Sequence, residues 1–229
     1  MVIFADTADI LEMKKLAHLV SGFTTNPTLM RKAGVSNYME WAAEVCRRFP
    51  NHEISLEVIG DDFETMERQA VKLAALGNNV YVKIPVTLTD GTPTIGLIRS
   101  LWNKNIKVNI TAVMTYEQVD WLIGIPEYGS KPTIMSIFSG RIADTGGTPE
   151  ALFSQAYRGG GREVRLLWAS TRELGNLFQA RHRDCQADII TLGPDLISKF
   201  PLIGKDLKDY SRETVQQFYD DAKAAGYTI

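Results

Sequence analysis

The stretch VYVKIP, Val80–Pro85, decides how the rest of the chain is interpreted, because it is the kind of β-branched apolar run that forms a buried strand. In such a strand Val80, Val82 and Ile84 share one face, and Lys83 lies on the other. A charged ammonium group in a buried strand is costly, so Lys83 needs a partner, a shift toward its neutral form, or a chemical role. From this stretch alone an exposed strand end, at which Lys83 simply reaches water, is an open alternative.

The overall composition is that of a water-soluble globular protein. Of the 229 residues, 45% are hydrophobic and 23% are charged, and the formal net charge is -2. This balance predicts no nucleic-acid partner and no membrane partner, and the apolar runs are too short to cross a bilayer. The strand-like VIFAD near the N-terminus carries no signal-peptide pattern, so we expect a cytoplasmic protein. Two isolated cysteines, Cys46 and Cys185, and three scattered histidines predict neither a disulfide framework nor a metal site.

Strand-like and helix-like segments alternate along the whole chain, which is the pattern of a parallel sheet with crossover helices. The helical segments have clear starts, such as Asp9 with Glu12, Asp62 before an apolar stripe, and Thr115 with Gln118. The eight strand candidates are Val2 to Asp6, Gly22 to Thr25, Ile54 to Val58, Asn79 to Pro85, Lys107 to Val113, Thr133 to Phe138, Val164 to Ala169 and Asp188 to Leu192.

Eight parallel strands, each followed by a helix, close most naturally into a (β/α)8 TIM barrel. An open doubly wound sheet is the main alternative, but no GxGxxG loop follows the first strand and no GxxxxGK[ST] motif occurs. The run Gly159-Gly160-Gly161 precedes a strand and does not open a helix, so we predict a turn there. No linker divides the chain, and we predict one domain over residues 1–229. Within it, residues 204–229 form a C-terminal helical segment, with a helix from Ser211 to Ala225 that is a candidate for packing on a neighbouring subunit.

Polar residues gather at the predicted strand ends, where the chemistry of a barrel takes place. Each has an ordinary explanation: Asp6 could cap the next helix, Asn26 could form a turn before Pro27, and Thr111 could be a simple strand residue. Their joint placement on seven of the eight strands favours a functional site instead. The residues are Asp6, Thr24, Thr25 and Asn26, Glu57, Lys83, Asn109 and Thr111, Ser136, Ser170 and Arg172.

These residue types suit carbonyl chemistry. Burial disfavours the charged form of Lys83, and a neutral amine attacks a carbonyl to form a Schiff base whose iminium is an electron sink. Cleavage of the adjacent carbon-carbon bond then needs a base and an acid, and Asp6 and Glu57 are available for these tasks. Donors that follow strands six and seven, where a barrel commonly binds phosphate, are Ser136, Arg141, Ser170 and Arg172.

Seven motifs resemble those of a known family, the transaldolases, and in particular the short single-domain branch that includes the fructose-6-phosphate aldolases. They follow the family order over about three quarters of the chain, and TTNP and the lysine strand are the most specific of them. The motifs are FADTAD (Phe4 to Asp9), GFTTNPTL (Gly22 to Leu29), SLEV (Ser55 to Val58), VYVKIPVT (Val80 to Thr87), VNITAV (Val108 to Val113), SIFSGRIAD (Ser136 to Asp144) and WASTR (Trp168 to Arg172).

The resemblance implies a (β/α)8 barrel in which Lys83 forms the Schiff base and a dihydroxyacetone unit is transferred between sugar phosphates. It implies that Asp6 deprotonates the hydroxyl beyond the cleaved bond, and that Glu57 is the acid and base through a water held with Thr111. By the same resemblance, Asn26 and Asn109 bind the dihydroxyacetone portion of the substrate, and Thr24 supports the end of the second strand. Substrate hydroxyls and phosphate are bound by Ser136, Arg141, Ser170 and Arg172. No metal or organic cofactor is expected, because the iminium serves as the electron sink.

Two positions bear on the choice between transferase and aldolase. The aldolase relatives typically carry glutamine and tyrosine where this chain has Glu57 and Phe138, and Phe138 has no hydroxyl to place a water. The chain also departs from the usual family pattern at Thr171, Ser139 and Trp168, which bears on the shape of the phosphate pocket.

We therefore expect a transaldolase that interconverts sedoheptulose 7-phosphate plus glyceraldehyde 3-phosphate with erythrose 4-phosphate plus fructose 6-phosphate. A fructose-6-phosphate aldolase that releases free dihydroxyacetone, and a non-catalytic sugar-phosphate-binding barrel, are the alternatives. The resemblance also implies a homo-oligomer, a pentamer or decamer, in which the C-terminal helix reaches a neighbour.

Overall fold

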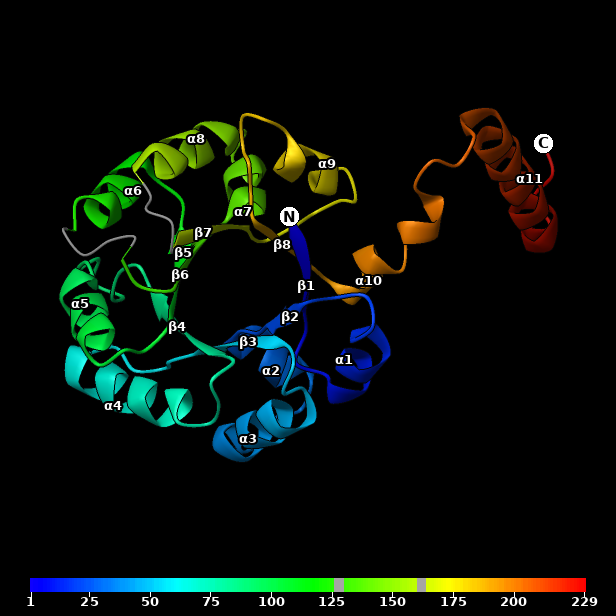
Figure 1. The fold of residues 1–229 in the computed structure, drawn as a ribbon. Helices are drawn as coiled ribbons and strands as arrows, with labels where there is room; N and C mark the ends of the chain where they lie inside the picture. Colours follow the sequence, from blue (N-terminus) through cyan, green and yellow to red (C-terminus); the bar gives the residue numbers. More distant parts are fainter. Residues whose placement is uncertain (126–129, 160–163) are drawn as a thin grey trace.

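The computed structural model describes residues 1–125, 130–159 and 164–229, and its centre is a closed barrel of eight parallel strands. Each strand pairs with the next in chain order, and β8 pairs with β1 to close the ring (Figure 1). This confirms the predicted (β/α)8 barrel and excludes the open doubly wound sheet. The strands are β1 (Val2–Asp6), β2 (Gly22–Thr24), β3 (Glu53–Glu57), β4 (Val80–Pro85), β5 (Val108–Val113), β6 (Thr133–Ile137), β7 (Val164–Trp168) and β8 (Ile189–Leu192).

Helices surround the barrel, and their starts follow the caps expected from the sequence (Figure 1). Asp9 and Asp62 accept hydrogen bonds from the first turns of their helices, and Thr115 forms a complete capping box with Gln118. The helices are α1 (Ile10–Leu16), α2 (Pro27–Lys32), α3 (Tyr38–Arg48), α4 (Phe63–Ala74), α5 (Ile95–Asn103), α6 (Tyr116–Ile123), α7 (Ser139–Asp144), α8 (Glu150–Gly159), α9 (Asn176–Arg181), α10 (Pro194–Ile197), the 3-10 turn η1 (Phe200–Leu202) and α11 (Leu207–Ala225).

The last helix begins earlier than the sequence predicted. Helix α11 starts at Leu207 instead of Ser211, because the Asp206 side chain accepts hydrogen bonds from the backbone N–H groups of Lys208 and Asp209 and caps it. Residues predicted to be a loop therefore form its first turn. Gly159 ends α8, whereas Gly160 and Gly161 lie outside the described residues, so the predicted turn there stays a prediction.

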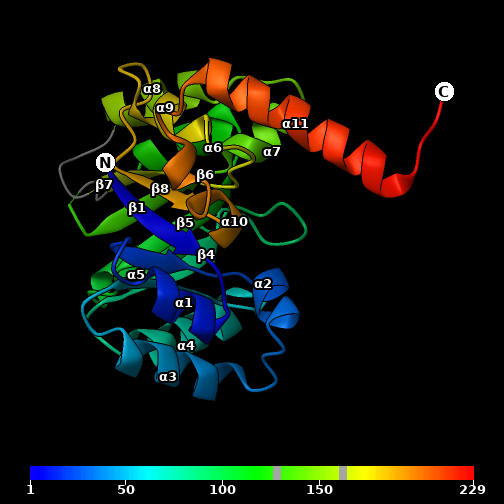
Figure 2. The ribbon, with the colours of Figure 1, turned by 90° about the vertical axis from the view of Figure 1, so that its right-hand side faces the viewer.

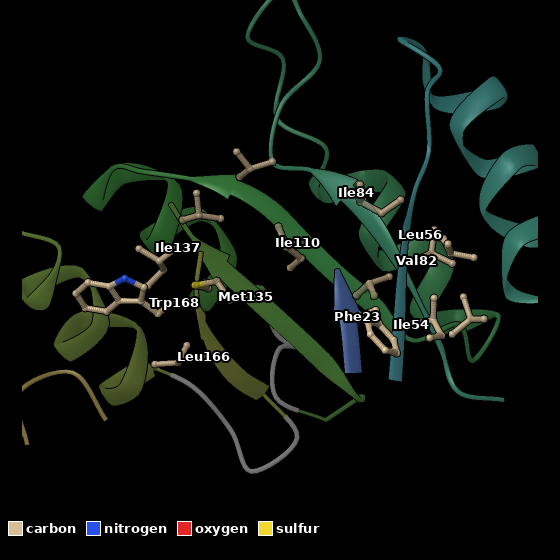
Figure 3. Packing of buried hydrophobic residues seen from close by; sticks show 14 of the residues in the cluster. Phe23, Ile54, Leu56, Val82, Ile84, Ile110, Met135, Ile137, Leu166 and Trp168 are labelled. Carbon is tan, nitrogen blue, oxygen red and sulfur yellow. The ribbon is translucent and has the colours of Figure 1, made fainter. Parts of the chain in front are cut away.

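The apolar residues form two separate clusters. The larger one fills the space between the barrel and the helices and includes Ile54, Leu56, Val82 and Ile84, part of which Figure 3 shows. The smaller one lies inside the barrel and contains Phe4, Tyr81, Ile134, Leu167, Ala169 and Ile189. The predicted division of β4 is confirmed, because Val82 and Ile84 join the outer cluster while Tyr81 faces the interior.

One end of the barrel interior is closed by charges and a glycine. Arg165 on β7 donates two hydrogen bonds, of 2.8 and 2.7 Å, to the carboxylate of Glu53 on β3, four strands around the ring. Gly22 makes room beside them, since a Cβ there would lie 2.8 Å from the Phe4 ring and 2.6 Å from the Glu53 carbonyl oxygen. Side chains therefore occupy this end of the interior, and the carboxyl ends of the strands lie at the opposite end of the barrel.

Helix α11 projects from the barrel (Figure 2), and none of its residues is buried. Several of its apolar side chains are exposed, including Leu207 at 79%, Val215 at 64% and Phe218 at 66%. None of the helices in the three described ranges is long and apolar enough to span a bilayer.

Candidate active site

Lys83 lies inside the barrel near the carboxyl end of β4, and only 5% of the residue is exposed. Its Nζ donates a hydrogen bond of 2.6 Å to the Thr25 carbonyl oxygen and lies 2.9 Å from Oε2 of Glu57. The parallel register of β3 and β4 places Glu57 directly beside Lys83. The alternative of an exposed lysine that reaches water is therefore wrong, since Lys83 is a buried cation with a carboxylate partner.

A pocket of about 100 Å³ opens above Lys83 at the carboxyl ends of the strands. Its lining includes nine of the residues singled out in the sequence, from six strands and the segments that follow them. These nine are Asp6, Thr24, Asn26, Lys83, Thr111, Ser136, Phe138, Arg141 and Ser170, and Leu167, Ala169 and Thr191 complete the wall.

Asp6 ends β1 and faces Lys83 across the pocket. Burial raises the pKa of its carboxyl group, whereas the Thr24 hydroxyl and the charge of Lys83 act to lower it and Glu57 acts to raise it. The Thr24 hydroxyl donates a hydrogen bond of 2.7 Å to Oδ1 of Asp6. A carboxylate with a raised pKa and a fixed donor can accept a proton from a substrate hydroxyl.

Glu57 lies between Lys83 and a second pocket of about 260 Å³ on the side of helices α3 and α4. The Tyr38 hydroxyl, from α3, donates a hydrogen bond of 2.8 Å to the Glu57 backbone carbonyl and fixes the end of β3. Burial first, and then the Glu57 charge, raise the pKa of Tyr38, so this phenol stays a donor. Glu57 therefore reaches the amine of Lys83 from a side of the barrel that the substrate pocket does not occupy.

Thr111 presents an unused hydroxyl to the substrate pocket. Its Oγ1 is buried and has no hydrogen-bond partner among the residues that the structure describes. The next residue, Ala112, has a φ of 63°, a left-handed conformation that is uncommon for alanine. An unsatisfied buried hydroxyl is costly, and a bound water or substrate group would satisfy it.

Asn109 lies fully buried one layer below the pocket and does not line it. Its Nδ2 donates to the Ser55 hydroxyl at 3.0 Å, and its Oδ1 accepts from the Ser136 hydroxyl at 2.7 Å. This row links β3, β5 and β6 and holds Ser136 at the wall. Asn26 has both a structural and a site position. Its Oδ1 accepts a hydrogen bond of 3.0 Å from the Leu29 N–H and caps α2, and the residue also lines the pocket.

The donors expected for phosphate divide into two groups. Arg141 and Ser170 line the pocket, and Ser170 adopts a φ of 61°. Arg172 does not line it, because its guanidinium group binds Asp144 through Nε at 3.1 Å and Nη2 at 2.6 Å. The same pair lowers the pKa of Asp144. In this structure Arg141 is the cation of the pocket wall beyond Lys83.

The comparisons with known proteins agree with this geometry. The family model described as Transaldolase/Fructose-6-phosphate aldolase matches residues 3–229. The chain belongs to the transaldolase/fructose-6-phosphate aldolase family. A protein from Bartonella henselae described as a probable transaldolase is 30% identical over 237 residues and all of both chains. One of the same description from Dehalococcoides mccartyi is 34% identical over 185 residues, 79% of this chain and 82% of the relative.

Solved structures show the likeness of fold alone. The crystal structure of 3-keto-L-gulonate-6-phosphate decarboxylase from Vibrio cholerae matches with a TM-score of 0.56 at 13% identity, over 84% of this chain and 87% of that one. The resemblance identified in the sequence is thus confirmed at the level of family and barrel, and the chain is an enzyme of the transaldolase/fructose-6-phosphate aldolase family.

Sequence reasoning missed one polar residue of this pocket, Thr191, and one partner of a predicted site residue, Asp144. Thr191 is the last residue but one of β8, the strand from which no site residue was predicted, and its hydroxyl lies 2.6 Å from that of Thr24. The available signal was a polar residue two positions before Gly193, near the end of the eighth strand. No local signal indicates that Asp144 holds Arg172, because the two are 28 positions apart.

Proposed function

We propose that this protein is a Schiff-base transaldolase, in which the Lys83 amine carries a dihydroxyacetone unit from one sugar phosphate to another. The observation that carries the proposal is the buried Lys83, whose Nζ lies 2.9 Å from Glu57 while Asp6 shares its pocket. One amine with two separately placed carboxylates is the set that a retro-aldol reaction through an iminium needs.

In the first half of the reaction the Lys83 amine adds to the ketone carbon of the donor sugar. Glu57 is placed to take the amine proton before attack and to return a proton to the carbinolamine hydroxyl, which leaves as water. The free hydroxyl of Thr111 would hold the water that carries this proton. The iminium that results withdraws electrons from the neighbouring carbon-carbon bond.

In the second half Asp6 removes the proton from the hydroxyl one carbon beyond that bond. The bond then breaks, an aldehyde leaves, and its electron pair is held as an enamine on Lys83. An acceptor aldehyde accepts this pair, Asp6 returns its proton to the new hydroxyl, and hydrolysis frees the amine. The steps need no metal or organic cofactor, because the iminium is the electron sink.

Glu57 and Phe138 favour transfer over release to water. A glutamate can exchange a proton where a glutamine cannot, and Phe138 lines the pocket without a hydroxyl that could place a water at the enamine. Arg141 and Ser170 would bind the phosphate groups of the substrates. Arg172 would also bind phosphate if its guanidinium group released Asp144.

The test is formation of sedoheptulose 7-phosphate from fructose 6-phosphate and erythrose 4-phosphate by the purified protein. No product would reject transfer, and free dihydroxyacetone released as fast as transfer would favour the aldolase. Activity should survive EDTA.

Borohydride trapping with fructose 6-phosphate tests the covalent step. We expect one adduct on Lys83 and none in Lys83→Arg, because a guanidinium group stays protonated and is no nucleophile. Lys15→Arg on the surface of α1 is the matched control and should be trapped normally. If the Lys83→Arg variant were active, the assignment of Lys83 as the nucleophile would be wrong. If the wild-type protein formed no adduct, the alternative of a non-catalytic sugar-phosphate-binding barrel would be favoured.

The projecting helix α11 supports a homo-oligomer, a pentamer or decamer by family resemblance. Leu207, Val215 and Phe218 lie on one side of this helix and are exposed. Val215→Glu with Phe218→Glu should lower the mass measured by light scattering, and an unchanged mass would contradict the role of α11. We also propose a cytoplasmic location, which fractionation of the source cells would test.

A further inference from the structure

Thr191 is the residue of the pocket wall to which nothing so far gives a role. It lies on β8, which closes the barrel against β1, and its register partner is Phe4, two residues before Asp6. Its hydroxyl oxygen lies 2.6 Å from that of Thr24, whose hydroxyl in turn donates to Asp6 at 2.7 Å. Thr24 and Thr191 are each 3% exposed, so water does not compete freely for these bonds.

The direction of each hydrogen bond in this chain follows from counting protons. An ionised Asp6 can only accept, and the Thr24 hydroxyl has a single proton, which it gives to Asp6. The short contact between the two threonine hydroxyls then requires Thr191 to be its donor. Without that donor, the Thr24 oxygen would be buried with one acceptor site unused.

We propose that Thr191 is a positioning residue that acts on Asp6 through Thr24, by holding the Thr24 proton toward the carboxylate. This inference rests on the proposed function, in which Asp6 is the base. A donor to the Thr24 oxygen polarises the Thr24 hydroxyl and strengthens its bond to the anion, so the ionised form of Asp6 is favoured.

The three groups also allow the reverse order after the proton transfer. Once Asp6 holds the substrate's proton, it can donate to Thr24, which can donate to Thr191, whose own proton then points into the pocket. In both orders each hydroxyl takes part in at least one hydrogen bond of the row, and only hydroxyl rotations are needed to change between them. Thr191 therefore allows the Thr24 hydroxyl to stay hydrogen-bonded to Asp6 both before and after the proton transfer.

The charged groups around Asp6 limit the size of the effect. Lys83 from β4 and Glu57 from β3 act on it in opposite directions, and Arg141 lines the same pocket. The backbone oxygen of Thr191 also accepts from the Thr171 hydroxyl at 3.0 Å, a structural contact that side-chain substitutions at position 191 leave in place. The contribution of the side chain can therefore be tested separately.

The test compares Thr191→Val, which has the same shape without the hydroxyl, with Thr191→Ser, which keeps it. We expect Thr191→Val to lower kcat about 3- to 10-fold, the effect of one hydrogen bond, and to move the acid limb of the kcat profile to higher pH. Thr191→Ser should restore both. Borohydride trapping on Lys83 should persist in all variants, because the Schiff base does not depend on Asp6.

Thr133→Val is the matched control, since Thr133 is a buried strand threonine whose hydroxyl donates to the Lys131 carbonyl at 3.0 Å, away from the site. It should leave kcat and the acid limb unchanged. A Thr191→Val enzyme with the wild-type rate and acid limb would overturn the proposal, as would a Thr191→Ser enzyme that behaves like Thr191→Val.

A second measurement does not depend on catalysis. The Asp6 carboxyl can be titrated by NMR after 13C labelling of aspartate, with Asp6→Asn to assign the signal. Thr191→Val should titrate at higher pH than the wild type, and identical curves would refute the proposal. A wild type without transfer or trapping would reject the proposed function, whereas a wild-type acid limb in Thr191→Val would reject only the role of Thr191.

Discussion

The ion pair between Lys83 and Glu57 should appear as a large coupling in the free energy of unfolding. The two side chains are 6% and 16% exposed, and their charged atoms lie 2.9 Å apart. Removing one partner of a buried pair costs about 3–5 kcal/mol, because the other charge stays buried without compensation. Glu57 keeps some contact with water, so we expect the lower end, about 3 kcal/mol, for Lys83→Met and again for Glu57→Gln.

The double variant removes both charges together. The double variant should lose about 3 kcal/mol of unfolding free energy, chiefly because the packing changes and the Thr25 carbonyl loses its donor. If the costs of the two single substitutions added, the loss would be about 6 kcal/mol. The difference, about 3 kcal/mol, is the predicted coupling between the two side chains.

The assay is urea unfolding of the four proteins at pH 7 and one protein concentration, because the stability of an oligomer depends on concentration. The surface pair Lys104 and Glu67 is the control, with its atoms 3.6 Å apart and side chains 48% and 34% exposed. Its cycle, with the same two substitutions, should give a coupling below about 1 kcal/mol. The buried ion pair would be refuted if the loss of unfolding free energy in the double variant equalled the sum of the losses in the two single variants to within about 0.5 kcal/mol.

Three further substitutions test other parts of the site. Burial raises the pKa of Asp6, so the folded state binds this proton more tightly than the unfolded state and loses stability as the pH rises from 3.8 through the raised pKa. Asp6→Asn should therefore raise Tm at pH 7 but not below pH 3.8, while kcat falls about 10²- to 10⁴-fold. Equal changes of Tm at the two pH values would contradict this explanation. Gly140→Ala would place Cβ 1.6 Å from the Ser170 carbonyl oxygen, so thermal melting should show a loss of more than about 2 kcal/mol, whereas Gly96→Ala, in open space on α5, should not destabilise. Phe138→Tyr should raise the ratio of free dihydroxyacetone to transfer product measured in one coupled assay, and an unchanged ratio would remove Phe138 from the account.

The sequence predicted the barrel well because local signals and the global fold agree. Each of the eight strands is an apolar run whose limits the structure shifts by one residue at most, and caps such as Asp62 and Thr115 mark where helices begin. Parallel strands in one ring bring all their carboxyl ends to one side, so listing the polar residues there identified most of the pocket wall. Periodicity and topology were sufficient for this part.

The contacts that the sequence did not reveal all join residues far apart in the chain. Thr24 and Thr191 are 167 positions apart and meet only because β8 closes against β1. Arg172 follows the expected strand, but Asp144 on α7 draws its guanidinium group away from the pocket wall. Strand order shows which side of the barrel a residue occupies, and it does not show which of several neighbours a flexible side chain will bind.

The Lys83 and Glu57 pair also explains how a charged intermediate can form in a buried layer. Moving a new charge into a site of low polarity would be costly, but an iminium on Lys83 carries the same positive charge at the same position as the ammonium group it replaces. Glu57, 2.9 Å away in the free enzyme, is then already the counter-ion of the intermediate. The protein has therefore met the desolvation cost of this charge during folding, and the reaction itself needs no new reorganisation around the nitrogen. When Asp6 takes the substrate proton, the iminium on Lys83 becomes a neutral enamine, so one negative and one positive charge are lost together and the net charge of the layer stays the same. The hydroxyls of Thr24 and Thr191 lie beside the carboxylate whose charge changes in this step.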